Sequence, residues 1–158
     1  MYKPLLRGTR TCYTGAAMRL HINKRGLSQV AKKHHLRFVI LHGSHATGHA
    51  REDSDIDIAV LGSKPIDFEQ QLQLFTDVDH LFRATPAHDL DLKTLHGVDP
   101  LFRYEVVRDG RLLYGDLDDY EDYKAFALRD YEDAQPLFAL ERVLAERYQQ
   151  HLNTLKVS

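Results

Sequence analysis

The sequence has a single cysteine, no tryptophan and no long hydrophobic run. Cys12 therefore has no partner for an internal disulfide and no neighbouring cysteine for a zinc site. No stretch approaches the roughly 20 consecutive apolar residues that a transmembrane helix needs. The basic N-terminus also lacks the continuous apolar run of a signal peptide. We therefore expect a cytoplasmic protein without a membrane segment, kept in a reducing compartment.

An excess of one sign of charge is also absent from the chain as a whole. The formal net charge is −2, which argues neither for nor against binding of a nucleic acid. The two signs are nevertheless separated along the chain: residues 1–37 hold nine basic and no acidic residues, whereas residues 115–133 hold eight acidic and two basic ones. Such blocks are typical of solvated faces. The acidic block is also a candidate for docking a basic partner.

The chain has 158 residues, of which 43% are hydrophobic, and this is enough for one domain with its own core. Residues 1–20 show no clear period, and we expect a poorly ordered N-terminal extension there. Helical and strand signals alternate in the rest of the chain, which predicts an α/β (α+β) fold. We place the main domain at residues 21–115 and a C-terminal helical segment, packed on the same domain, at residues 116–158.

The hydrophobic periods predict the individual elements. Strands are expected at residues 36–41, 55–62, 88–95 and 111–115. Helices are expected at residues 28–35 with Ser28 as the cap, at 66–82, at 100–108 after a cap at Asp99, and at 120–152 with a break before Pro136. In the second of these helices the apolar side chains that fit one face are Ile66, Leu72, Phe75, Val78, Leu81 and Phe82.

The stretch HGSHATGHAREDSDIDIAV, residues 42–60, places two carboxylates at the start of an apolar strand. Side chains alternate across a strand, so Asp55 and Asp57 should share one face. Ile56, Ile58 and Val60 should then point the other way, into the core. Two neighbouring carboxylates repel each other unless a cation lies between them. Oxygen ligands favour Mg²⁺ or Mn²⁺ over zinc, and such sites usually add substrate phosphate and water. We therefore expect a phosphate-bearing substrate.

The same stretch supplies groups suited to that phosphate. Gly43 lets the backbone turn sharply and approach a ligand closely, and Ser44 offers a backbone N–H and a hydroxyl. A two-metal nucleotidyl transfer needs a further carboxylate from a neighbouring strand, and Asp89 and Asp91 share one face of the strand expected there. A Gly-Ser pair or a D-x-D motif alone is common in loops. Their combination at this spacing, with a second D-x-D strand downstream, is specific.

The segment GSHATGHAREDSDIDIAV resembles the G-S-x10-D-x-D signature of nucleotidyltransferases with a DNA polymerase beta-like fold. The small size and the downstream DLKTL and PLFRYEVVRDGRLLYG segments resemble the minimal nucleotidyltransferases, which are the MNT-domain antitoxins that pair with HEPN-domain toxins. The resemblance covers about residues 36–115, with a weaker helical similarity after them. It implies a short mixed sheet with helices on one side.

This resemblance implies roles for particular residues. The implied set consists of nucleotide-binding Gly43 and Ser44, and of catalytic and metal-ligating Asp55, Asp57 and Asp91. Asp89 is the substitute for Asp91 as the third carboxylate. The implied cofactors are two Mg²⁺ ions, with ATP as the substrate. The chain departs from the family pattern at His42, where an aromatic residue is usual, and at Thr47, where arginine is frequent.

The implied function is that of an antitoxin that transfers AMP from ATP to a hydroxyl, such as that of a tyrosine, on a cognate HEPN toxin in a separate chain. One alternative is a non-catalytic antitoxin of the same fold that neutralises its partner by docking alone, although such a protein has no need for mutually repelling carboxylates. Another is transfer to a small molecule, which generally requires an added substrate domain. A nucleic acid is not expected as a direct substrate.

Overall fold

The computed structural model describes residues 22–51, 54–82 and 89–155, so the extension expected at residues 1–20 lies outside the described part. The elements are α1 (Lys24–Lys33), β1 (Leu36–His42), α2 (Gly43–Thr47), β2 (Ile56–Gly62), α3 (Phe68–Phe82), β3 (Leu90–Thr94), α4 (Pro100–Asp109), β4 (Arg111–Tyr114) and α5 (Leu117–Leu155). The strands form one sheet in the order β3-β2-β1-β4. β1 pairs antiparallel with β2 and β4, whereas β2 pairs parallel with β3. The predicted α/β fold with a mixed sheet is confirmed.

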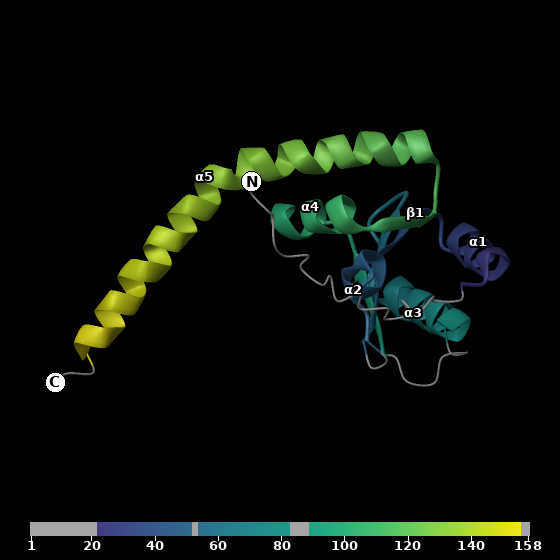
Figure 1. Ribbon diagram of the computed structural model, residues 1–158, viewed down its shortest axis with the longest axis horizontal. Coiled ribbons are helices and arrows are strands. Elements are labelled where there is room, and N and C mark those ends of the chain that lie inside the picture. The colour runs from purple at the N-terminus through teal and green to yellow at the C-terminus, as the bar shows by residue number, and fades with distance from the viewer. Residues whose placement is uncertain (1–21, 52–53, 83–88, 156–158) are drawn as a thin grey trace, which may run out of the picture.

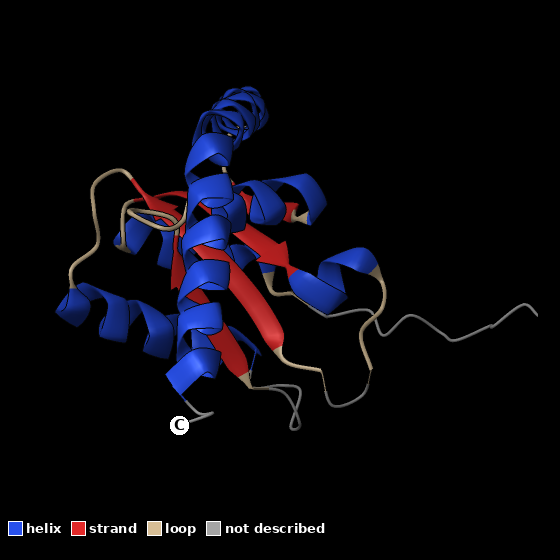
Figure 2. Cartoon of the chain, turned by 90° about the vertical axis from the view of Figure 1, so that its left-hand side faces the viewer, coloured by secondary structure: helices blue, strands red, loops and turns tan. Residues whose placement is uncertain are grey.

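Helices cover both faces of the sheet (Figures 1 and 2). On one face, α1 and α3 pack against a core that includes Leu41 and Ile58. On the other face, α4 and the start of α5 pack against a second core that includes Ile40 and Ala59. The expectation of helices on one side only is therefore wrong. The physical reason is that β1 and β2 are apolar at successive positions, so each strand presents apolar side chains to both faces.

The helix α1 begins one turn earlier than predicted. Asn23 is its cap, since the side-chain oxygen of Asn23 accepts a hydrogen bond from the backbone N–H of Gly26 at 3.1 Å. Ser28, the predicted cap, lies inside the helix, because Asn is as good a cap as Ser and comes first in the chain. The helix ends at Lys33, and His35 adopts a φ of +51° where the chain turns toward β1.

The apolar face predicted for residues 66–82, which include α3, is confirmed in part, since Ile66 and Leu81 also pack against the core. Val78 and Phe82 are buried as expected, together with Leu74. Leu72 and Phe75, which were expected to face the core, are 58% and 38% exposed. Apolar residues recur at helical spacing on two faces of this helix, so the hydrophobic period alone could not identify the buried face.

The helix α5 continues through Pro136, so the predicted break before this residue is wrong. Figure 1 shows that the helix bends partway along, which is the usual effect of an internal proline. Tyr120, Tyr123 and Ala127 pack into the core, whereas the side chains of residues 139–150 are all exposed. Among the described helices, none is long and apolar enough to cross a membrane.

The predicted start of α4 is confirmed. A side-chain oxygen of Asp99 accepts hydrogen bonds from the backbone N–H groups of Leu101 at 2.8 Å and Phe102 at 3.2 Å. Pro100 is the first helical residue, where its missing N–H costs nothing. This cap fixes the end of α4 that carries Phe102, which packs beside the candidate site described below.

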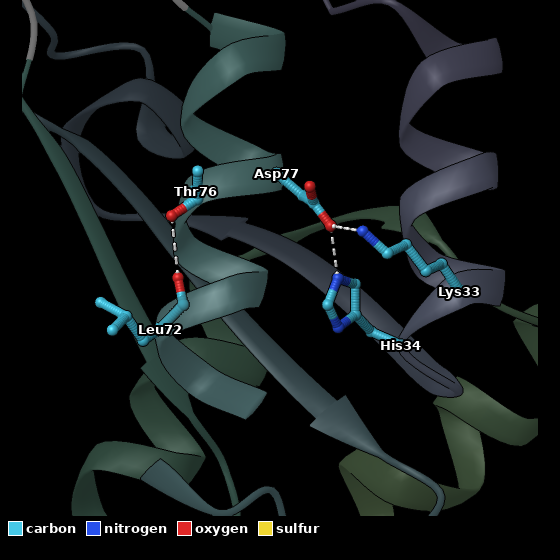
Figure 3. Close-up of polar contacts among 5 residues, drawn as sticks. All are labelled: Lys33, His34, Leu72, Thr76 and Asp77. Atoms are coloured by element: carbon cyan, nitrogen blue, oxygen red, sulfur yellow. Dashed lines mark hydrogen bonds and ion pairs between the residues drawn. The ribbon is translucent and has the colours of Figure 1, made fainter. Parts of the chain in front are cut away.

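An ion-pair cluster links α1 to α3 (Figure 3). Lys33 Nζ lies 2.6 Å from Oδ2 of Asp77, and His34 Nε2 lies 2.6 Å from the same oxygen. The hydrogen bonds from Lys33 and then from His34 hold the pKa of the Asp77 carboxyl below its ordinary value. Because the folded pKa is the lower one, the resulting stabilisation is present above the unfolded pKa and is lost as the pH falls through the folded pKa.

We therefore expect Asp77→Asn to lower the free energy of unfolding at pH 7 by less than about 1 kcal/mol, since the cluster is partly exposed to solvent. The difference from the wild type should shrink as the pH is lowered toward 3. Urea unfolding across this range measures it, with the exposed Asp133→Asn as a control. A constant difference at all pH values would show that the carboxylate charge is not responsible.

Candidate active site

The Gly43-Ser44 pair and the aspartates meet at one edge of the sheet. β1 ends at His42, and α2 begins directly after it with Gly43. The antiparallel pairing of β1 with β2 places His42 opposite Asp57. The parallel pairing of β2 with β3 places Asp57 opposite Asp91. Asp57 is therefore the central residue of this edge, with a neighbour on each side.

The predicted alternation along β2 is confirmed. Ile56, Ile58 and Val60 belong to the core on the side of α1 and α3. Because side chains alternate, Asp57 points to the opposite face of the sheet, which α4 covers. Asp55 stands just before the strand and is exposed, whereas Asp57 is half-buried.

The backbone of Gly43 lies directly against the carboxylate of Asp57. A Cβ atom added to Gly43 would be only 2.1 Å from Oδ2 and 2.9 Å from Cγ of Asp57. Gly43 also has a φ of +67°, a conformation that other residues adopt only with strain. Both constraints require glycine at this position. Because glycine has no side chain, the start of α2 can approach the Asp57 carboxylate closely.

A depression of about 470 Å³ collects most of the predicted site residues. Its lining consists of Ser44, His49, Arg51, Ser54, Asp55 and Asp57. The sequence pattern did not single out Arg51, whose guanidinium is suited to phosphate oxygens. A larger depression of about 710 Å³ lies between the end of α1 and the start of α3, and none of the predicted site residues lines it.

Asp91 is held by a lysine of its own strand. Lys93 Nζ lies 2.7 Å from Oδ2 of Asp91, and the two side chains are 49% and 43% exposed. The same ammonium lies 5.4 Å from the ring centroid of Phe102 on α4. The sequence pattern did not single out Lys93, although its place two residues after Asp91 puts both side chains on one face.

The substitute carboxylate, Asp89, precedes β3 and is not part of it. Its backbone carbonyl accepts a hydrogen bond from the N–H of Ile56 at 2.8 Å, so the main chain of Asp89 helps to join β3 to β2. The residue opposite Asp57 in the register is Asp91 and not Asp89.

His42 is buried beneath this edge, with only 9% of its surface exposed. Its Nε2 atom has no hydrogen-bond partner among the described residues. Its ring meets the Phe102 ring edge-on, with the centroids 5.8 Å apart. Burial lowers the pKa of His42, and the negative charge of Asp57 opposes this only in part. At neutral pH the ring is therefore neutral and adds no positive charge beside Asp57.

The carboxylates are ligands of the kind that Mg²⁺ takes. The described part of the chain contains no group of three His, Cys, Asp or Glu side chains that could hold a metal ion as they stand. The residues nevertheless fit such an ion by their chemistry, since Asp57 and Asp91 are neighbours in the register and a protein cation already offsets one of them. Asp55, Asp57 and Asp91 are the groups that could hold it.

Comparison with solved structures identifies the fold. A crystal structure of a toxin–antitoxin with AMP-PNP is similar with a TM-score of 0.65 and 23% identity, over 81% of this chain and 99% of that chain. A tri-AMPylated Shewanella oneidensis HEPN toxin in complex with an MNT antitoxin gives a TM-score of 0.60 and 22% identity, over 80% and 96% of the two chains. The MntA-HepT toxin–antitoxin structure gives 0.60 and 22%, over 80% and 97%. No curated protein matches the chain significantly.

A family model described as "Polymerase beta, Nucleotidyltransferase" matches residues 26–119. This range contains every predicted site residue, from Gly43 to Asp91, and each element from β1 to β4. The resemblance predicted from the G-S-x10-D-x-D segment is thereby confirmed. Because the match spans more than half of the sequence, the chain belongs to the polymerase beta nucleotidyltransferase family.

Proposed function

We propose that this protein is a Mg²⁺-dependent nucleotidyltransferase that moves AMP from ATP to a hydroxyl of a cognate HEPN-domain toxin and so neutralises it. The observation that carries the proposal is the register that sets Asp57 beside Asp91, with the backbone of Gly43 against the Asp57 carboxylate. Membership of the nucleotidyltransferase family supports the chemistry. The likeness to toxin–antitoxin structures, one with AMP-PNP and one with a tri-AMPylated toxin, supports the substrate and the partner.

Each site residue has a role in this proposal. Gly43 and Ser44 bind the triphosphate, while Asp55, Asp57 and Asp91 hold the metal. When bound, Mg²⁺ would polarise the phosphates and favour ionisation of the attacking hydroxyl. The hydroxyl oxygen forms a bond to the α-phosphorus, and the bond from that phosphorus to the bridging oxygen breaks. The hydroxyl proton passes to solvent, and pyrophosphate leaves.

The position of the transferred phosphorus gives a direct test. With Mg²⁺, the toxin and ATP labelled at the α-phosphate, we expect label on the toxin and a gain in toxin mass of one or a few AMP units. With ATP labelled at the γ-phosphate, we expect no label on the toxin, because that phosphorus leaves as pyrophosphate. Mass spectrometry of the modified toxin locates the acceptor, which we expect to be a tyrosine.

Three other results would contradict the proposal. Label from the γ position would identify a kinase. A toxin that is fully neutralised without any gain in mass would identify an antitoxin that acts by docking alone. Label found only on a small molecule in the presence of the toxin would identify a nucleotidyltransferase that acts on small molecules.

A further inference from the structure

We propose that Lys93 is a positioning residue that forms an ion pair with Asp91 in the metal-free protein. This ion pair breaks when a metal ion binds together with the nucleotide. This inference rests on the proposed function. It concerns the ammonium group of Lys93, to which the proposed function assigns no role.

Two elements fix the position of the Lys93 ammonium. On β3 it is 2.7 Å from Oδ2 of Asp91, and on α4 the ring centroid of Phe102 lies 5.4 Å from it. An aromatic face attracts a cation, so the ring and the carboxylate act on Nζ together. The Phe102 ring is itself packed edge-on against the buried His42. The lysine is thus held at the site by a carboxylate and by a supported aromatic ring.

The charge at this edge explains what the lysine does. Asp57 and Asp91 are neighbours in the register, and Asp55 leads into the same strand. Without a cation these carboxylates repel each other. The Lys93 ammonium offsets part of that repulsion, so it stabilises the site while no metal is bound.

A metal ion that uses Asp91 must compete with this ammonium. A metal ion that binds alone adds a positive charge close to Lys93 and replaces the ammonium as the partner of Asp91. A nucleoside triphosphate brings phosphate oxygens, which can replace Asp91 as partners of the ammonium. The lysine therefore weakens binding of the metal alone more than binding of the metal with nucleotide, and this is a coupling between the two ligands.

Binding of Mn²⁺, used as a paramagnetic substitute for Mg²⁺ and followed by electron paramagnetic resonance, tests this coupling. We expect Lys93→Met to bind Mn²⁺ alone about twofold to fivefold more tightly than the wild type, the range for a partly exposed ion pair. Methionine keeps an unbranched side chain beside Phe102 but has no ammonium group. Lys93→Arg, which keeps the charge, should bind Mn²⁺ as the wild type does.

The effect of nucleotide gives a second measurement. Adding AMP-PNP should tighten Mn²⁺ binding by a smaller factor in Lys93→Met than in the wild type, because the variant has no ammonium to transfer to the phosphates. Lys64→Met is the matched control, since Lys64 is an exposed lysine in the larger depression, away from the carboxylates. This control should match the wild type in both measurements.

The outcomes separate this inference from the proposed function. If Asp57→Asn abolishes Mn²⁺ binding but Lys93→Met, with unchanged circular dichroism, binds Mn²⁺ no more tightly than the wild type, the role of Lys93 is wrong. If Asp57→Asn leaves Mn²⁺ binding unchanged, the ion binds elsewhere, and the metal site of the proposed function is wrong as well.

Discussion

Replacing Asp57 by Asn should reduce AMP transfer by about a hundredfold or more, which is the loss seen when one group that stabilises a transition state is removed. Asp57 is the central carboxylate of the site, opposite both His42 and Asp91. Asn keeps the shape of the side chain but cannot offset the charge of a divalent ion. The fold should survive, because removing a negative charge relieves repulsion. Initial rates of label transfer to the toxin measure the first effect, and thermal unfolding without Mg²⁺ measures the second.

The two downstream aspartates provide a matched pair of variants. Asp91→Asn should lose activity to a similar degree, and so should Asp55→Asn, since both carboxylates belong to the proposed metal site. The transfer rate of Asp89→Asn should stay within a fewfold of the wild-type rate. The hydrogen bond that joins Asp89 to Ile56 uses the backbone carbonyl of Asp89, which the substitution leaves in place. An inactive Asp89→Asn beside an active Asp91→Asn would make Asp89 the third carboxylate. Full activity in Asp57→Asn would contradict the metal site altogether.

Substituting Gly43 by alanine should destabilise the protein more than substituting Gly48 does. Both glycines have positive φ, +67° and +79° respectively, so alanine at either position costs about 1–2 kcal/mol. A Cβ on Gly48 meets nothing within 4 Å, whereas a Cβ on Gly43 collides with the Asp57 carboxylate. We expect this collision to add about 1–3 kcal/mol, as overpacking does, and to abolish transfer. Urea unfolding of the two variants measures the difference.

A double variant identifies the source of the extra cost. Replacing Asp57 by alanine removes the two atoms that lie nearest the added methyl group, so it should recover much of the stability lost in Gly43→Ala. The double variant should therefore lose less stability than the sum of the losses in the two single variants. Equal stability losses in Gly43→Ala and Gly48→Ala would show that α2 moves away from Asp57 without cost.

Local patterns predicted the parts of the site that lie within one stretch of chain. The alternation of Asp57 with Ile56 and Ile58 follows from the geometry of a single strand, and it is present in the structure, although Asp55 lies just before the strand. The register between strands is a tertiary property. Sequence alone therefore left Asp89 and Asp91 as alternatives, whereas the pairing of β2 with β3 places Asp91 opposite Asp57. Whether Asp91 acts as a ligand stays a prediction.

The errors in the predicted fold arose where several local solutions had similar energies. Asn23 and Ser28 can both cap a helix, and only the folded chain shows that Asn23 does so. The helix α3 has apolar residues on two faces, and packing against β1 and β2 selects the face with Leu74. Pro136 is compatible with either a break or a bend, and α5 continues through it. Lys93 was missed although its contact with Asp91 lies within one strand, whereas its contact with Phe102 joins β3 to α4 and depends on the tertiary fold.

The parallel pairing of β2 with β3 also sets the time at which the site is completed during synthesis. β1 and β2 are antiparallel and close in sequence, so the approach of Gly43 to Asp57 needs only a short loop to close. Asp91 follows Asp57 by 34 positions, and α3 lies between them in the chain. At translation rates of about 5–20 residues per second, a nascent chain spends roughly 2–7 s with the first two carboxylates made and the third still missing. A nucleotidyltransferase with this strand order therefore has all three of these carboxylates only after more than half of its chain has been synthesised.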